Sequence, residues 1–102
     1  MEKIAVESMT AAQLQSLALG ELGDALASTM VAIRDCGSAA ISARAELGRL
    51  RAARSRGDPL ISRGEHDARI EEARAIFDSI RIRASSLREL KSTLQTLIRA
   101  HV

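Results

Sequence analysis

The chain has 102 residues, of which 46% are apolar, and its formal net charge is +2. This length suits a single domain, and the apolar content is too high for a disordered polyelectrolyte. The chain has one aromatic residue, Phe77, which excludes an aromatic platform for stacking single-stranded bases. Because Ala and Leu dominate the apolar residues and Arg dominates the basic ones, the composition favours helices over strands. We therefore predict an all-α protein.

The N-terminal residues contain charges close together and no apolar segment of the signal-peptide type. No uncharged segment reaches the length of about 20 residues that a membrane-spanning helix needs. Cys36 is the single cysteine, so no disulfide can form within the chain. These features together predict a cytoplasmic protein with no membrane span.

The first helix is predicted over residues 10–56. Thr10 and Gln13 have the spacing of a capping box, in which each side chain satisfies a backbone N–H of the other residue. Residues 1–9 precede this start and are expected to be frayed. Farther along, apolar or small residues recur at alternating intervals of three and four, which is the heptad pattern of a coiled-coil seam. The seam positions are Leu19, Leu22, Leu26, Thr29, Ile33, Cys36, Ala40, Ala43, Leu47 and Leu50.

Gly37 is the position at which this helix could break. The Gly37-Ser38 pair has the composition of a helix end followed by a new N-cap, and a break there would give a three-helix bundle. The heptad phase, however, continues across Gly37 without interruption, which favours one continuous helix. The three-helix bundle is kept as the alternative.

The turn is predicted over residues 57–62. Gly57 suits the position after a helix end, and Asp58-Pro59 or Ser62 with Glu65 could start the next helix. The second helix is therefore predicted from residue 59 or 63 to about residue 100. Such a short connection makes the two helices antiparallel neighbours in one domain, residues 10–102. The second seam is Ile70, Ala73, Phe77, Ile80, Ala84, Leu87 and, after a small shift of phase, Leu90, Leu94 and Leu97.

The distribution of charge also favours a long antiparallel helical hairpin. Net charge alternates along the chain: −3 over residues 1–35, +4 over 36–64, −3 over 65–78 and +4 over 79–102. Folding at Pro59 places each acidic block opposite a basic block, which a parallel arrangement does not do.

Apolar residues outside the seam predict an interaction surface. A single seam rarely offsets the conformational entropy lost by so long a chain. We therefore expect the hairpin to complete a helical bundle by homo-oligomerisation or by binding a partner protein, as a scaffold, co-chaperone or regulatory subunit. The predicted interaction residues are Met30, Val31, Ile41, Ile76, Ile82 and Ile98.

An arginine-rich patch near the turn supports an alternative function in nucleic-acid binding. Acidic residues opposite it in the hairpin, such as Glu65 and Asp67, should cancel much of its field, so nucleic acid is not the expected partner. The patch consists of Arg44, Arg49, Arg51, Arg54, Arg56 and Arg63.

No residue pattern predicts catalysis. His66 and His101 belong to no cluster with metal-ligand spacing, and His66 is expected in a solvated first helical turn. Cys36 lies on the seam and is expected to be a packed thiol, with no histidine near it in sequence. The glycines form no phosphate-binding loop. We predict no enzymatic activity, metal, cofactor or small-molecule substrate.

Two resemblances bear on function. In plan the chain resembles the small helical-hairpin co-chaperones of bacterial type III secretion, which implies a bacterial protein whose apolar face shields a partner's helix. Gly57-x-Pro59-Leu60 resembles the loop before the second helix of single-domain helical chorismate mutases. That family's site uses a Lys before the loop and an Arg-Glu pair after it. Here the nearest positions hold Arg54, Glu65 and His66, so no active site is carried over.

Overall fold

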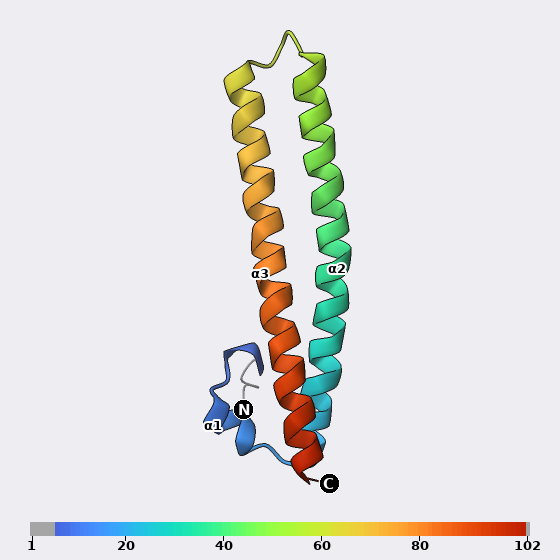
Figure 1. Ribbon diagram of the computed structural model, residues 1–102, viewed down its shortest axis with the longest axis vertical. Coiled ribbons are helices and arrows are strands. Elements are labelled where there is room, and N and C mark those ends of the chain that lie inside the picture. Colours follow the sequence, from blue (N-terminus) through green and yellow to red (C-terminus); the bar gives the residue numbers. More distant parts are fainter. Residues whose placement is uncertain (1–5, 102) are drawn as a thin grey trace. The chain divides into compact units, whose positions relative to one another are not determined.

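The protein is all-α, as predicted. A computed structural model describes residues 6–101 and contains no strand within them. Its elements are the 3₁₀ turn η1 (Val6–Ser8) and the helices α1 (Ala11–Gln15), α2 (Leu19–Arg56) and α3 (Arg63–His101). Helices α2 and α3 pack against each other as an antiparallel helical hairpin (Figure 1). The predicted fold class is therefore confirmed.

Helix α2 is continuous through Gly37. It spans 38 residues without a break, so the alternative three-helix bundle divided at Gly37 is wrong. Among the described glycines only Gly57 has a positive φ, which means that Gly37 adopts an ordinary helical conformation. The cost of a glycine inside a helix is about 1 kcal/mol relative to Ala, too little to end a helix whose seam continues on both sides.

The start of the first long helix differs from the prediction. The capping box at Thr10 is present, with the Thr10 N–H donating to Gln13 Oε1 at 2.8 Å and the Gln13 N–H donating to Thr10 Oγ1 at 3.2 Å. However, the helix it opens ends at Gln15, so one helix over residues 10–56 is wrong. Helix α2 starts separately, with Glu21 Oε1 accepting from the Ala18 N–H at 3.0 Å.

Residues 6–9 are folded, and the prediction of fraying is wrong for them. Val6–Ser8 form η1, and the Met9 N–H donates to the Val6 carbonyl at 3.2 Å. Val6 and Met9 also pack against buried residues of the core, which holds this turn in place. Residues 1–5, to which the same prediction applied, lie outside the described part of the chain.

After the turn, helix α3 begins at the later of its two predicted starting points. Gly57 has φ 70°, the left-handed conformation that glycine adopts without a steric penalty. Asp58 does not cap the helix, because its Oδ1 accepts from the Leu60 N–H at 2.9 Å and so closes the turn. Ser62 Oγ instead accepts from the Glu65 N–H at 3.1 Å, and α3 begins at Arg63.

The hairpin contains two compact units. The first unit comprises residues 6–35 and 84–101, and the second comprises residues 36–83. In the first, the buried residues Leu14, Leu22, Ala25 and Leu94 form one cluster. All three of the largest fully buried side chains in the described chain, Leu22, Leu87 and Leu94, belong to this unit.

The second unit has a smaller core. Leu47, Ile70 and Ala73 are buried together, and Leu50 packs against them. These contacts pair the residues just before the turn with those just after it, as the antiparallel seam predicts. Figure 1 shows this end of α2 and the start of α3 running in opposite directions on either side of the turn.

The end of the second seam centres on Leu94. Leu94 is fully buried, and the residues in phase with it are Leu87 and Lys91, which are buried and half-buried respectively. Leu90 and Leu97, the positions after the predicted phase shift, are half-buried as well. They pack against the cluster that contains Leu14, Leu22, Ala25 and Leu94. Leu19, predicted on the seam, is 46% exposed at the start of α2.

The seam can be tested by comparing Leu47→Ala with Ile41→Ala. Leu47 is buried in the core of the second unit, whereas Ile41 is 74% exposed on the same helix. We expect Leu47→Ala to lower the free energy of unfolding by about 2–5 kcal/mol, because it leaves a cavity, and Ile41→Ala to lower it by less than about 1 kcal/mol. Urea denaturation followed by circular dichroism measures both. Equal losses from the two changes would contradict the assigned heptad phase.

Candidate interaction surfaces

One edge of the first unit is covered by the N-terminal segment, residues 6–18. We give seam residues the heptad letters a and d, so that position g precedes each a. Position g is occupied by Ala25 in α2 and by Leu90 and Leu97 in α3, and all three belong to the cluster around Leu14. Leu14 is itself only 5% exposed. The N-terminal segment therefore acts as a third layer over the g positions of this unit.

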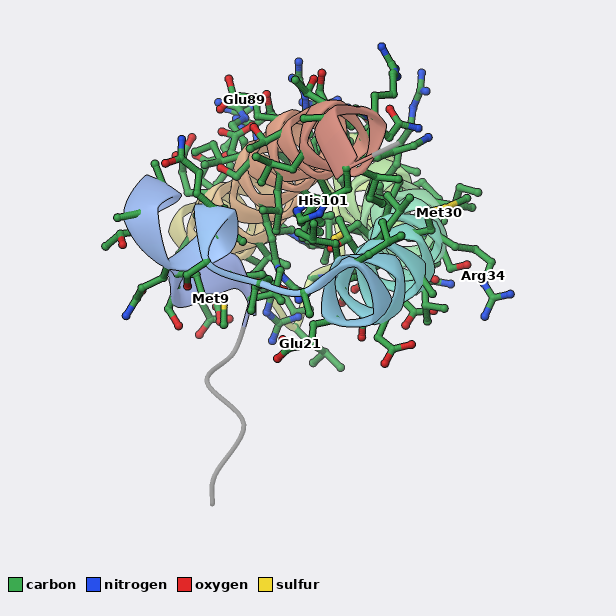
Figure 2. All side chains as sticks on the ribbon, turned by 90° about the horizontal axis from the view of Figure 1, so that it is seen from below. Met9, Glu21, Met30, Arg34, Glu89 and His101 are labelled. Carbon is green, nitrogen blue, oxygen red and sulfur yellow. The ribbon has the colours of Figure 1, made fainter. Side chains whose placement is uncertain are left out.

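Figure 2 shows the same arrangement from the end of the first unit. Met9, on the N-terminal segment, lies on one side of the helix pair, and Met30, on α2, points outward on the other side. Met30 is 49% exposed, whereas Met9 is half-buried against the core. Within this unit, the side that carries Met30 is thus the uncovered one.

The g positions of the second unit line an open groove. Three residues at g positions line it: Glu46 in α2 and Arg69 and Ile76 in α3. The groove has a volume of about 350 Å³, and we refer to it below as the g groove. Its lining consists of Glu46, Leu50, Arg69, Glu72, Ala73 and Ile76.

The g groove combines an apolar floor with a charged rim. Ala73 is buried and Leu50 half-buried, while Ile76 is 53% exposed. Glu46 forms an ion pair with Arg49 on its own helix. Neither Arg69 nor Glu72 has an ion-pair partner among residues 6–101. The rim therefore presents one cation and one anion that the described residues leave unpaired.

The predicted interaction residues do not form a single surface. Five of them are exposed, but they occupy different heptad positions: Ile41 is at b, Ile76 at g and Ile82 at f. Ile98 is half-buried and packs against the core cluster of the first unit. In the unshifted heptad it occupies an a position. The exposed five are Met30, Val31, Ile41, Ile76 and Ile82.

All six arginines of the basic patch belong to the second unit. Arg54 Nε lies 2.5 Å from Asp67 Oδ1 across the hairpin, and Arg49 pairs with Glu46. Glu71, one of the acids expected to oppose the patch, pairs instead with Arg74 on its own helix. The acids opposite the patch thus make one ion pair with it in the described structure. Four arginines have no ion-pair partner there: Arg44, Arg51, Arg56 and Arg63.

This geometry sets an expectation for binding to duplex DNA. Two of the six cations are paired, so we expect a dissociation constant no better than about 10⁻⁴–10⁻⁶ M at physiological salt, the range of non-specific contact. Fluorescence anisotropy with a labelled duplex measures it. Nanomolar binding with a steep salt dependence, lost in Arg49→Ala and Arg54→Ala together, would instead favour a nucleic-acid function.

His66 is buried, contrary to the prediction of a solvated first turn. His66 is 4% exposed, and its Nε2 atom has no hydrogen-bond partner among the described residues. The reason is its position: His66 precedes Ile70 by four residues and so takes a d position of the seam. Thr29, another buried polar residue on the seam, differs because its hydroxyl donates to the Ala25 carbonyl at 2.8 Å.

Replacing His66 tests the cost of this unpartnered atom. His66→Leu removes a buried polar nitrogen and supplies an apolar side chain at a seam position, so we expect the free energy of unfolding to rise by about 1 kcal/mol or more. The exposed His101 is the matched control, and His101→Leu should change stability by less than about 0.5 kcal/mol. Thermal and urea melts followed by circular dichroism give both values. A loss of stability in His66→Leu would show that the imidazole makes a stabilising contact.

Other candidate chemistry is sparse. Cys36 is buried on the seam, as expected for a packed thiol. Across residues 6–101, no group of three or more His, Cys, Asp and Glu side chains is arranged to hold a metal ion. Neither α2 nor α3 has, in its described residues, an apolar stretch sufficient to cross a bilayer.

Comparison with known proteins adds no family. The chain has no significant match among protein-family models, curated proteins or solved structures. The surfaces described above therefore carry the functional argument.

Proposed function

We propose that this protein is a non-catalytic helical interaction and assembly module, which binds helices of a second copy or of another protein. The observation that carries this proposal is the packing of the second unit. Its core consists of Leu47, Ile70 and Ala73, none of which is among the fully buried side chains. Meanwhile Ile41, Ile76 and Ile82 of the same unit are 74%, 53% and 69% exposed.

The energetics of such a unit favour further association. Ordering the backbone costs roughly 1–2 kcal/mol per residue, and a small core offsets little of that cost. Full burial of an Ile side chain contributes about 1.5–3 kcal/mol. A docked helix that covers even one of these isoleucines would therefore add a substantial fraction of a small domain's net stability, about 5–15 kcal/mol.

The scaffold, co-chaperone and regulatory roles are particular forms of this proposal. The resemblance in plan to type III secretion co-chaperones supports the second of them, in a bacterial cytoplasm. Nucleic-acid binding is the second candidate, supported by the four unpaired arginines of the basic patch. We favour protein binding because the exposed isoleucines contribute nothing to phosphate recognition, which depends on cationic and hydrogen-bonding groups.

The proposal predicts association in solution. At micromolar concentrations we expect a molar mass above the 11.0 kDa of one chain and a melting temperature that rises with concentration. Light scattering after size-exclusion chromatography measures the mass, with concentration taken from refractive index because the chain has no Trp or Tyr. Val31→Ala and Ile41→Ala, at exposed positions, should leave helicity unchanged. A monodisperse 11.0 kDa species with a cooperative, concentration-independent melt would contradict self-association.

A further inference from the structure

We propose that the g groove of the second unit is the site at which a second copy of this chain docks, through a two-fold symmetric contact between the groove-facing sides of their α3 helices. This inference rests on the proposed function and names both the surface and its occupant. It is built on the apolar floor of the groove, its unpaired charges and the way the same heptad positions are covered elsewhere in the chain.

The first unit shows how the g positions of this helix pair are covered when a third element is present. There Leu14 of the N-terminal segment and Ala25 belong to one buried cluster, against which Leu17, Leu90 and Leu97 pack. In the second unit the g positions have no such cover and border the groove, with Ile76 53% exposed. The N-terminal segment cannot serve both units at once, because Leu14 is already buried in the first.

The charges of the rim are self-complementary. Arg69 and Glu72 are three residues apart on α3, so they project from neighbouring positions on the same side of the helix. A two-fold axis between them, perpendicular to the helix, runs α3 of one copy antiparallel to α3 of the other. Arg69 of each copy then faces Glu72 of the other, and two reciprocal ion pairs form. A second copy thus supplies a partner for each of these two charges, which residues 6–101 leave unpaired.

The apolar floor lies directly beside these charges. Ala73 and Leu50 form the floor, and Ile76 lies one helical turn beyond Glu72. Bringing two such grooves together removes Ile76 of each copy from water and assembles four helices around the second unit, the arrangement of a helical bundle. An unrelated helix could cover the same apolar floor, but its charges would have to match by coincidence.

The test exchanges the charges of the rim. Arg69→Glu alone and Glu72→Arg alone place like charges opposite each other at both contacts, so each variant should self-associate roughly tenfold more weakly than the natural chain. The double variant, Arg69→Glu with Glu72→Arg, restores two opposite pairs and should associate like the natural chain. When the two single variants are mixed, only the mixed dimer has opposite charges at both contacts, and it should predominate. Native mass spectrometry resolves the three pairings, because their masses differ.

Two matched changes on exposed residues control for the loss of charge itself. Asp78→Arg reverses an acid on α3 away from the groove, and Arg44→Glu reverses an unpaired arginine on α2. Neither should alter the dimer by more than about twofold. Ile76→Ser should weaken the dimer, whereas Ile82→Ser should not, since Ile82 does not line the groove. Circular dichroism confirms that each variant keeps its helicity.

The outcomes separate this inference from the broader proposal. If the natural chain associates and the rim reversals do not change its affinity, the g groove is not the contact. The same holds if the two single variants mix without preference for the mixed dimer. Either result leaves the proposed function standing. A natural chain that remains monomeric would overturn both the groove contact and self-association. The two-fold contact is supported if each single reversal weakens the dimer and if dimer affinity recovers both in the double variant and in the mixture of the single variants.

Discussion

The apolar seam between α2 and α3 is the interaction on which the rest of this structure depends. Its residues recur at the heptad spacing, and in each unit they bring residues of α2 against residues of α3 that are distant in sequence. The ion pairs contribute less, because Arg54 and Asp67, which join the two helices, are 37% and 55% exposed at their side chains. Exposed pairs of this kind contribute at most about 1 kcal/mol. The alternating charge blocks therefore favour the antiparallel arrangement without holding it together.

The two units use that seam differently. In the first, the N-terminal segment adds a third layer, and Leu22 and Leu94, which share a cluster with Leu14, are fully buried. In the second, the seam is closed by α2 and α3 alone, and apolar side chains remain on its edges. This difference explains why the candidate docking site lies in the second unit: two helices can enclose a narrow stripe of side chains, and a third or fourth is needed to cover the flanking positions.

Polar residues on the seam show a second constraint. Thr29 satisfies its hydroxyl with the carbonyl one turn before it, which any helix provides. His66 has no hydrogen-bond partner for Nε2, so its burial carries a desolvation cost. This cost falls in the second unit, which also has the smaller core.

The sequence by itself determined the helical class, the continuity of α2, the position of the turn and most seam residues. These features follow from local rules: a 3.5-residue apolar period, the glycine after the end of α2 and the serine that caps α3 act over a few residues, so each is visible in a short stretch of the chain. Tertiary structure alone decided the packing of the N-terminal segment, the burial of His66 and the pairing of charges. Leu90 and Leu97 are the clearest example, since they are apolar positions beside the seam and the sequence could not show which segment covers them. The same reason applies to the g groove, because a surface formed by residues from two helices depends on their register, which one-dimensional spacing does not fix.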